Sequence, residues 1–349
     1  MPFVRALLRG GATALTSSLL IAMSGCADDR DWRHPHEHAL GTFDAKAPEP
    51  VKPVRFEFHD GLLMNLHHFL VDAARNPDRL EHAPWAQPPS PQELAALRAA
   101  AAYYALHYGK QEVFDDDMTA IKRALSVRDD TLASADGLGL PPELAAVLDG
   151  VGPIYARVLW PTHRQADEAW INNVATLNAR HGDEIQSRLE HAFSHAFPAS
   201  IRVDVVYDTG DFRGAYTDSP PPQTVMPSSR ASYNGEASLE MLWHEASHAG
   251  AVDTLVADID ADAKALHRKA PEDLWHVALF YTVGYVVQDV YRETEGLDYT
   301  PYAVKRNLYA HGSWQLSDTL LETRWLPWLQ GKGSMREAVT KLVSGLPPA

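Results

Sequence analysis

The residues in this chain whose types and spacing could do chemistry are His244, Glu245 and His248. A helix through residues 239–250 would place the two histidines one turn apart on the same face, close enough to share one small cation. Glu245 would lie about 100° around the helix from His244, beside that cation, where it could act as a base toward a water molecule. Imidazole ligands and an open fourth position suit zinc best. The sequence therefore predicts a zinc site with Glu245 as its catalytic base.

The same stretch shows how such a helix would be held in place. Its apolar residues fall on the side away from the two histidines, where they can pack in a core: Leu239, Leu242, Trp243 and Ala246. Gly250 follows the second histidine by two residues, and a glycine commonly ends a helix at such a position. We therefore expect a core-anchored helix that presents both histidines from one face.

The segment before this helix has the alternation expected of strands. Residues 201–207 alternate apolar and polar for most of their length and are rich in β-branched side chains, and residues 212–217 and 224–229 can form two more short strands. Pro227 has no backbone N–H, which favours the edge of a sheet for the last of these strands. We therefore expect a short antiparallel edge sheet directly before the helix.

Short strands followed by a His-Glu-x-x-His helix resemble the active-site region of the zincin metallopeptidases, and the resemblance extends from Arg202 to Gly250. It implies a zincin-like domain in which an extended peptide or protein substrate pairs with the edge strand. It also implies peptide-bond hydrolysis by a zinc-activated water that Glu245 deprotonates.

The resemblance leaves the third zinc ligand open. In the metzincin pattern a glycine and a further ligand follow the second histidine, but Ala251 and Thr254 stand at those positions. A glutamate at the aminopeptidase-like spacing would fall on His267, and the Asn-Glu pair of thermolysin-like enzymes is not seen. The chain also resembles a group of bacterial envelope proteins in two stretches, Leu-Trp-His at residues 242–244 and Phe-Tyr-Thr-x-Gly at residues 280–284. This second resemblance does not imply any activity.

A second predicted helix, residues 271–290, offers two candidate ligands. Pro271 suits its first turn, and nearly every residue from 274 to 287 is apolar or aromatic, so the helix should be buried most of the way round. A buried imidazole at His276 needs a partner, either the metal or a carbonyl or hydroxyl group. Glu272, one turn earlier on the same face, is the alternative ligand, or would orient His276 from behind. We predict that His244, His248 and His276 hold the zinc ion.

The first 26 residues predict export and lipid attachment. Arg5 and Arg9 precede an apolar run, residues 11–23, that is too short to span a bilayer. The small residues before Cys26, the only cysteine, resemble a bacterial lipobox; the alternative is an ordinary secretory signal. An acylated Cys26 would anchor the protein to a membrane on the periplasmic side, and Ala27 resembles the pattern for sorting to the outer membrane. Residues 27–54, polar and containing several prolines, predict a flexible tether.

The rest of the chain divides into a helical scaffold region, residues 55–200, and a zincin-like metal-binding region, residues 201–349. In the first region, helical spacing recurs at residues 61–74, 92–108, 111–126, 142–158, 165–180 and 183–196. Its histidines are expected to have structural roles: His59, His67, His68 and His163. The predicted fold class is α+β and predominantly helical.

The composition limits the possible partners. A net charge of −15 argues against nucleic-acid binding and against simple attraction to anionic membranes. We predict a zinc-dependent peptidase of the bacterial cell envelope. The alternative is a non-catalytic envelope lipoprotein whose helical domain binds a partner, or whose metal is structural and closed by a fourth protein ligand.

Overall fold

The computed structural model describes residues 52–126, 130–210, 214–311 and 314–349. The predicted signal peptide and lipobox, and residues 27–51 of the predicted tether, lie outside the described residues. No helix within the described residues is long and apolar enough to cross a membrane.

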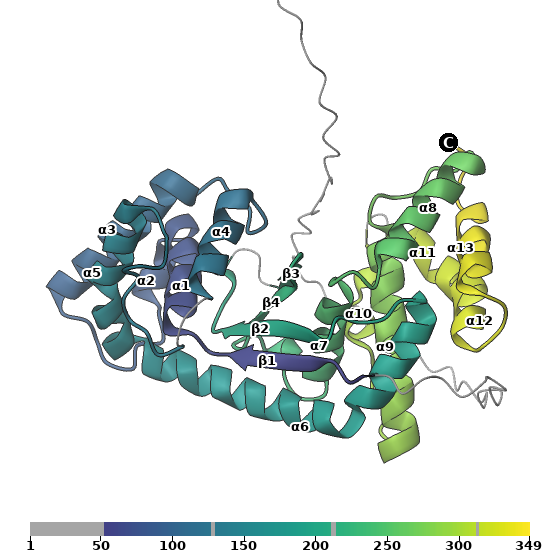
Figure 1. Ribbon diagram of the computed structural model, residues 1–349, viewed down its shortest axis with the longest axis horizontal. Coiled ribbons are helices and arrows are strands. Elements are labelled where there is room, and N and C mark those ends of the chain that lie inside the picture. Colours follow the sequence, from purple (N-terminus) through teal and green to yellow (C-terminus); the bar gives the residue numbers. More distant parts are fainter. Residues whose placement is uncertain (1–51, 127–129, 211–213, 312–313) are drawn as a thin grey trace, which may run out of the picture. The chain divides into compact units, whose positions relative to one another are not determined.

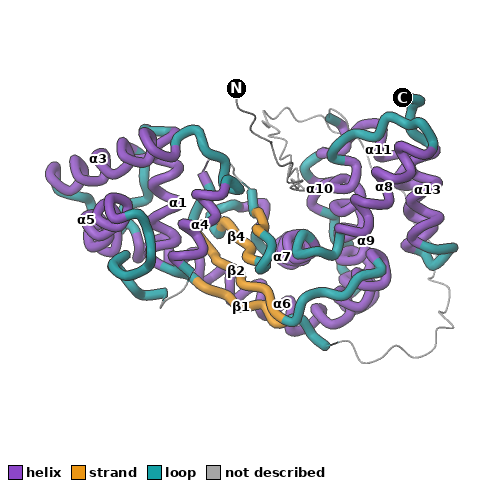
Figure 2. The backbone as a smooth tube through the Cα atoms, turned by 45° about the horizontal axis from the view of Figure 1, so that its top comes forward, coloured by secondary structure: helices purple, strands orange, loops and turns teal. Residues whose placement is uncertain are grey.

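The described chain is mixed α and β, mostly helical, with one small sheet (Figures 1 and 2). This agrees with the predicted α+β, predominantly helical class. The strands are β1 (Arg55–His59), β2 (Ser200–Val206), β3 (Tyr216–Asp218) and β4 (Gln223–Pro227). The longer helices are α1 (Leu62–Arg75), α3 (Pro91–Tyr108), α4 (Asp116–Leu125), α5 (Pro142–Val158), α6 (Trp160–Phe193), α7 (Ala237–Ser247), α8 (Asp253–Ala265), α9 (Leu274–Glu295) and α13 (Met335–Ser344). Shorter helical segments are α2 (Asp78–Glu81), η2 (Ala231–Tyr233), α10 (Tyr302–Lys305), η3 (Leu308–Ala310), α11 (Gln315–Leu320), the π-helical turn η5 (Leu321–Trp325) and α12 (Leu326–Leu329).

The four strands lie in the order β1-β2-β4-β3. β1 pairs with β2 and β2 pairs with β4 in parallel, and only β3 and β4 are antiparallel. The expectation of an antiparallel sheet is therefore wrong for two of the three pairings. Alternation along a strand shows that one face is buried, but it carries no information on which strand lies alongside or in which direction.

The sequence suggested that the strand containing Pro227 lies at the edge of the sheet, and this expectation is wrong. β4 is buried along its whole length between β2 and β3, and the two edge strands are β1 and β3. The antiparallel pairing of β3 with β4 ends at Val225, so Pro227 lies beyond it and pairs only with Val206 of β2. A proline at the end of a strand leaves the ladder of the neighbouring strand intact.

Region 55–200 is not wholly helical, because it begins with β1. Phe56 and Phe58 alternate with polar residues, which is the period of a strand, and they pair with Ile201 and Val203 of β2. The chain therefore makes its first strand before α1 and returns to the sheet only after α6. In Figure 1 the long helix α6 runs beside β1 and β2.

The predicted helices at residues 165–180 and 183–196 are one continuous helix, α6. Gly182 does not interrupt this helix, and its missing side chain leaves room for the side chain of a neighbour. A Cβ at Gly182 would come within 2.6 Å of Oδ1 of Asn178. That oxygen accepts a hydrogen bond of 3.0 Å from Nε1 of Trp243, so this position ties α6 to α7.

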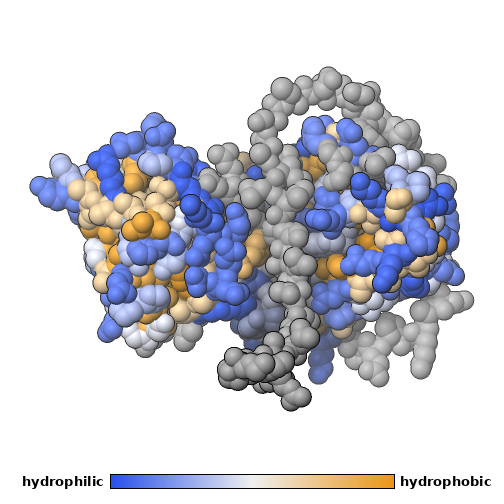
Figure 3. Space-filling model, turned by 90° about the horizontal axis from the view of Figure 1, so that it is seen from above, coloured by the Kyte–Doolittle hydropathy of each residue, from blue (hydrophilic) through white to orange (hydrophobic). Residues whose placement is uncertain are grey.

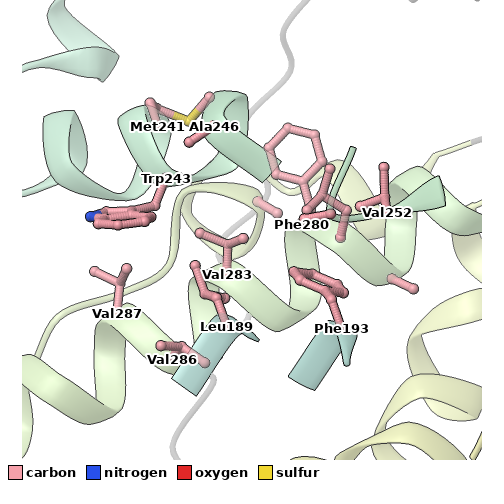
Figure 4. Packing of buried hydrophobic residues seen from close by; sticks show 14 of the residues in the cluster. Leu189, Phe193, Met241, Trp243, Ala246, Val252, Phe280, Val283, Val286 and Val287 are labelled. Carbon is pink, nitrogen blue, oxygen red and sulfur yellow. The ribbon is translucent and has the colours of Figure 1, made fainter. Parts of the chain in front are cut away.

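The helix α7 is anchored in a large apolar cluster that it shares with α6 and α9 (Figure 4). Leu239, Leu242, Trp243 and Ala246 are each at most 1% exposed, which confirms the predicted core face. The Trp243 ring lies between Phe56 and Phe197, with edge-to-face geometry at 5.2 and 5.3 Å. Burial of this many large side chains fixes the position and rotation of α7.

A second apolar cluster joins α1, α3, α4 and α5 to Val206, Tyr216 and Val225 of the sheet. Figure 3 shows apolar residues between polar ones on the surface of the molecule, and Leu106 on α3 is 80% exposed. The edge strand β3 thus contacts this cluster through Tyr216, while α7 lies in the other cluster.

Candidate metal centre

Local contacts fix both ends of α7. Before its first turn, Nδ2 of Asn173 donates to the Gly235 carbonyl and to Oγ of Ser238, at 3.1 and 2.9 Å. At the other end His248 is the capping residue, and Gly250 has φ of +101°, which favours glycine. The helix therefore stops as the sequence predicts, with His244 in its last turn and His248 directly after it.

The three predicted ligands converge. The Nε2 atoms of His244 and His276 are 3.2 Å apart, and those of His248 and His244 are 3.3 Å apart. All three histidines offer ring nitrogens within 4.8 Å of one another, so they could hold one metal ion. Ligands at about 2.0–2.1 Å from a tetrahedral zinc ion lie about 3.3–3.4 Å from one another, which is close to the observed separations.

The protonation of these rings also fits a cation. Burial lowers the pKa of His248 to about 3 and that of His276 to about 4, and it lowers the pKa of His244 well below its usual value. All three imidazoles are therefore neutral near pH 7, and a neutral imidazole has a lone pair to donate. His244 is buried, whereas His248 and His276 are partly exposed.

Aromatic side chains surround the three rings. Phe280 stacks on His244 with centroids 3.8 Å apart, and Trp275 stacks on His276 at 5.1 Å. The edge of Trp275 meets His248 at 5.5 Å. These rings restrict the orientation of each imidazole and lower the local dielectric constant, which strengthens interactions with any charge at the centre.

Glu245 follows His244 on α7, and its carboxylate is held by the edge strand β3. The hydroxyl of Thr217 on β3 donates to Oε2 of Glu245 at 2.9 Å and lies 3.0 Å from Oγ1 of Thr224 on β4. Burial raises the pKa of Glu245 to about 8, and the hydrogen bond from Thr217 opposes the rise. A carboxyl group with a pKa near neutrality can both accept and release a proton.

The alternative ligand lies apart from this cluster. Glu272 is exposed in the turn before α9 and does not belong to the group of converging ligands, whereas His276 lies in the first turn of the helix. The acidic residues of α8 also lie outside the group. One of them, Asp262, is buried and accepts hydrogen bonds from Arg336 and Thr340.

The histidines of the first region have other partners. His59 pairs with Asp130, and the buried rings of His67, His68 and His163 bond to tyrosine hydroxyls. Among the described residues, none of them belongs to the group of histidines that could hold a metal ion. The structural roles expected for them agree with these contacts.

Sequence reasoning missed the residues that support the site. Thr217 lies far before His244 in the sequence, and no local pattern connects them. Phe280 follows His276 by one turn of α9, but the sequence does not show that its ring stacks on His244. Glu240 could have been noticed, because it lies one turn before His244 and is an acidic residue among apolar ones. It is fully buried, accepts hydrogen bonds from Tyr299 and from the Tyr302 backbone, and has its pKa raised to about 7 by burial.

A separate pocket of about 530 Å³ lies at the carboxyl ends of β2 and β4 and is not lined by the three histidines. Arg79 and Asp208 on its wall form an ion pair, at 3.3 Å, so its charges are largely matched.

Comparisons of the chain with models of known protein families, with curated proteins and with solved structures found no match.

Proposed function

We propose that this chain is a zinc-dependent peptidase with a zincin-like arrangement of edge strand and metal helix. The observation that carries the proposal is the spacing of the three Nε2 atoms, and Glu245 follows His244 directly on α7. Neutral imidazoles suit zinc, and His244, His248 and His276 would hold it. Zinc bound there supplies Lewis-acid chemistry, because it acidifies water and polarises a carbonyl group.

The number of ligands favours an active site over a structural one. Among the described residues the cluster contains three candidate ligands and no fourth. A structural zinc site is normally closed by four protein ligands, whereas a catalytic site keeps one position for water or substrate. The non-catalytic alternative, with a closed metal site, therefore has less support.

The chain's own groups account for proton transfer. Glu245 accepts a proton from the attacking water and delivers it to the leaving amine. Thr217 holds the Glu245 carboxylate by one oxygen, which leaves the other oxygen for this role. Because Thr217 belongs to β3, the base and the edge strand are fixed relative to each other.

The same strand supports a peptide or protein as the substrate. Within the described part of the chain, β3 pairs with β4 on one side only. In this proposal an extended peptide pairs with its other edge through backbone hydrogen bonds. Lys122 of α4 and Asp218 of β3 form a buried ion pair at 2.6 Å, which holds β3 against α4.

The cellular setting belongs to the same proposal. The lipobox-like sequence ending at Cys26 supports a lipid anchor, and the polar stretch after it supports a tether in the periplasm. We place the enzyme in the bacterial envelope, at the outer membrane. Its negative charge is consistent with attachment through the lipid and not through surface charge.

The Glu245→Gln variant tests the mechanism. It keeps the shape of the side chain and its acceptor for Thr217 but removes the base, so the variant should keep its metal and lose peptide hydrolysis. The assay is digestion of a peptide library by zinc-loaded protein, with Glu272→Gln as a matched control on an exposed carboxylate. Hydrolysis by Glu245→Gln at the control's rate would show that Glu245 is not the base. A wild-type protein that retains zinc but cleaves nothing would favour the non-catalytic alternative.

A further inference from the structure

Glu240 and His244 lie one turn apart on α7, and residues at this spacing face the same side of a helix. Both side chains are buried, at 0% and 2% exposure. Each has one polar atom without a hydrogen-bond partner among the described residues: Oε1 of Glu240 and Nδ1 of His244. A buried polar atom without a partner is unusual and calls for an explanation.

The two atoms are chemically complementary once a metal is bound. Nε2 of His244 faces the other two histidines, so its lone pair is the one directed at the ion. A neutral imidazole carries one proton, which must then be on Nδ1. This N–H is a donor without an acceptor, and one turn away a carboxylate oxygen is an acceptor without a donor.

The surroundings of Glu240 hold one carboxylate oxygen and leave the other free. Oε2 accepts the Tyr299 hydroxyl at 2.6 Å and the Tyr302 backbone N–H at 2.8 Å. Oε1 lies against Gly284 of α9, where an added Cβ would come within 3.2 Å of it. The missing side chain of Gly284 therefore makes room for this oxygen between α7 and α9.

We propose that Glu240 is a positioning residue of the metal centre, with Oε1 accepting a hydrogen bond from Nδ1–H of His244 when the metal is bound. Such a bond fixes the tautomer of the ring and its angle, and it raises the basicity of Nε2. The carboxylate also places a negative charge behind a ligand of the cation. The inference rests on the metal site of the proposed function, but it does not require the protein to be a peptidase.

The Glu240→Gln variant separates this role from a purely structural one. Its amide oxygen can still accept from Tyr299 and Tyr302, but its NH₂ group would then face Nδ1–H of His244, donor against donor. Zinc affinity, measured by competition with a chelator, should fall about 10–100-fold. The matched control is Asp167→Asn, since Asp167 is an equally buried carboxyl group whose partners are Ser228 and Asn65. Its zinc affinity should stay within about threefold of the wild type, below the change typical of an orienting group.

A folded Glu240→Gln variant that binds zinc as tightly as the control would overturn the proposal. A wild-type protein that binds no zinc would overturn the metal site itself, which is a different result. A second measurement needs no variant: nitrogen-15 NMR of the zinc-loaded wild type should show a protected, hydrogen-bonded Nδ1–H on His244. A rapidly exchanging Nδ1–H there would also refute the role of Glu240.

Discussion

The Glu240→Gln substitution should stabilise the metal-free protein at neutral pH, although we expect it to weaken metal binding. Burial raises the pKa of Glu240 from its usual 4.5 to about 7. Below pH 4.5 the group is protonated in both states and contributes no difference. As the pH rises from 4.5 to 7, the unfolded chain loses this proton while the folded chain keeps it, so the free energy of unfolding falls. The difference of about 2.5 between the two pKa values corresponds to about 3 kcal/mol, lost in full above pH 7.

Glutamine resembles the neutral acid and carries no such penalty. The stability of Glu240→Gln relative to the wild type should therefore increase between pH 4.5 and 7 by about 3 kcal/mol and then level off. Urea unfolding with a chelator present, at several pH values between about 4 and 8, measures this difference. Glu272→Gln serves as the control, because that carboxylate is exposed. If the difference in free energy of unfolding between variant and wild type does not change with pH, or grows toward acid pH, then Glu240 is not a buried carboxyl group with a raised pKa.

Two further predictions concern the site and the anchor. His276→Ala should lower zinc affinity by far more than the roughly 10–100-fold typical of losing a group that only orients a ligand, whereas Glu272→Ala should lose less than that, because Glu272 is exposed and lies outside the converging ligands. Chelator competition measures both, and the ligands are reversed if Glu272→Ala loses the zinc while His276→Ala keeps a full equivalent. Cys26→Ser should leave the protein soluble or unprocessed instead of membrane-bound. Processed Cys26→Ser protein in the membrane fraction would contradict the lipobox.

The central part of the site was accessible from the sequence because its geometry is local. The spacing of His244 and His248 on one helix determines their approach, and the apolar side of that helix determines which face is buried. His276 was accessible for a different reason: an imidazole in an otherwise apolar helix needs a partner. The convergence of all three in space agrees with both lines of reasoning.

Other features depend on contacts between distant segments. The directions of the strands follow from the pairing of β2 with β1 and β4, which alternation within β2 does not encode. Thr217 reaches Glu245 only because β3 returns antiparallel beside β4. Gly182 would weaken an isolated helix, but in α6 it makes room for Asn178 to bond to Trp243.

The most direct test of the metal centre is zinc X-ray absorption on the purified protein loaded with one equivalent of the ion. Three histidines and one exchangeable position predict a shell of nitrogen and oxygen atoms at about 2.0–2.1 Å, with the multiple scattering of three imidazole rings. His276→Ala should reduce that imidazole contribution to two rings. Failure to retain zinc, or an unchanged imidazole contribution in His276→Ala, would contradict a centre built from His244, His248 and His276.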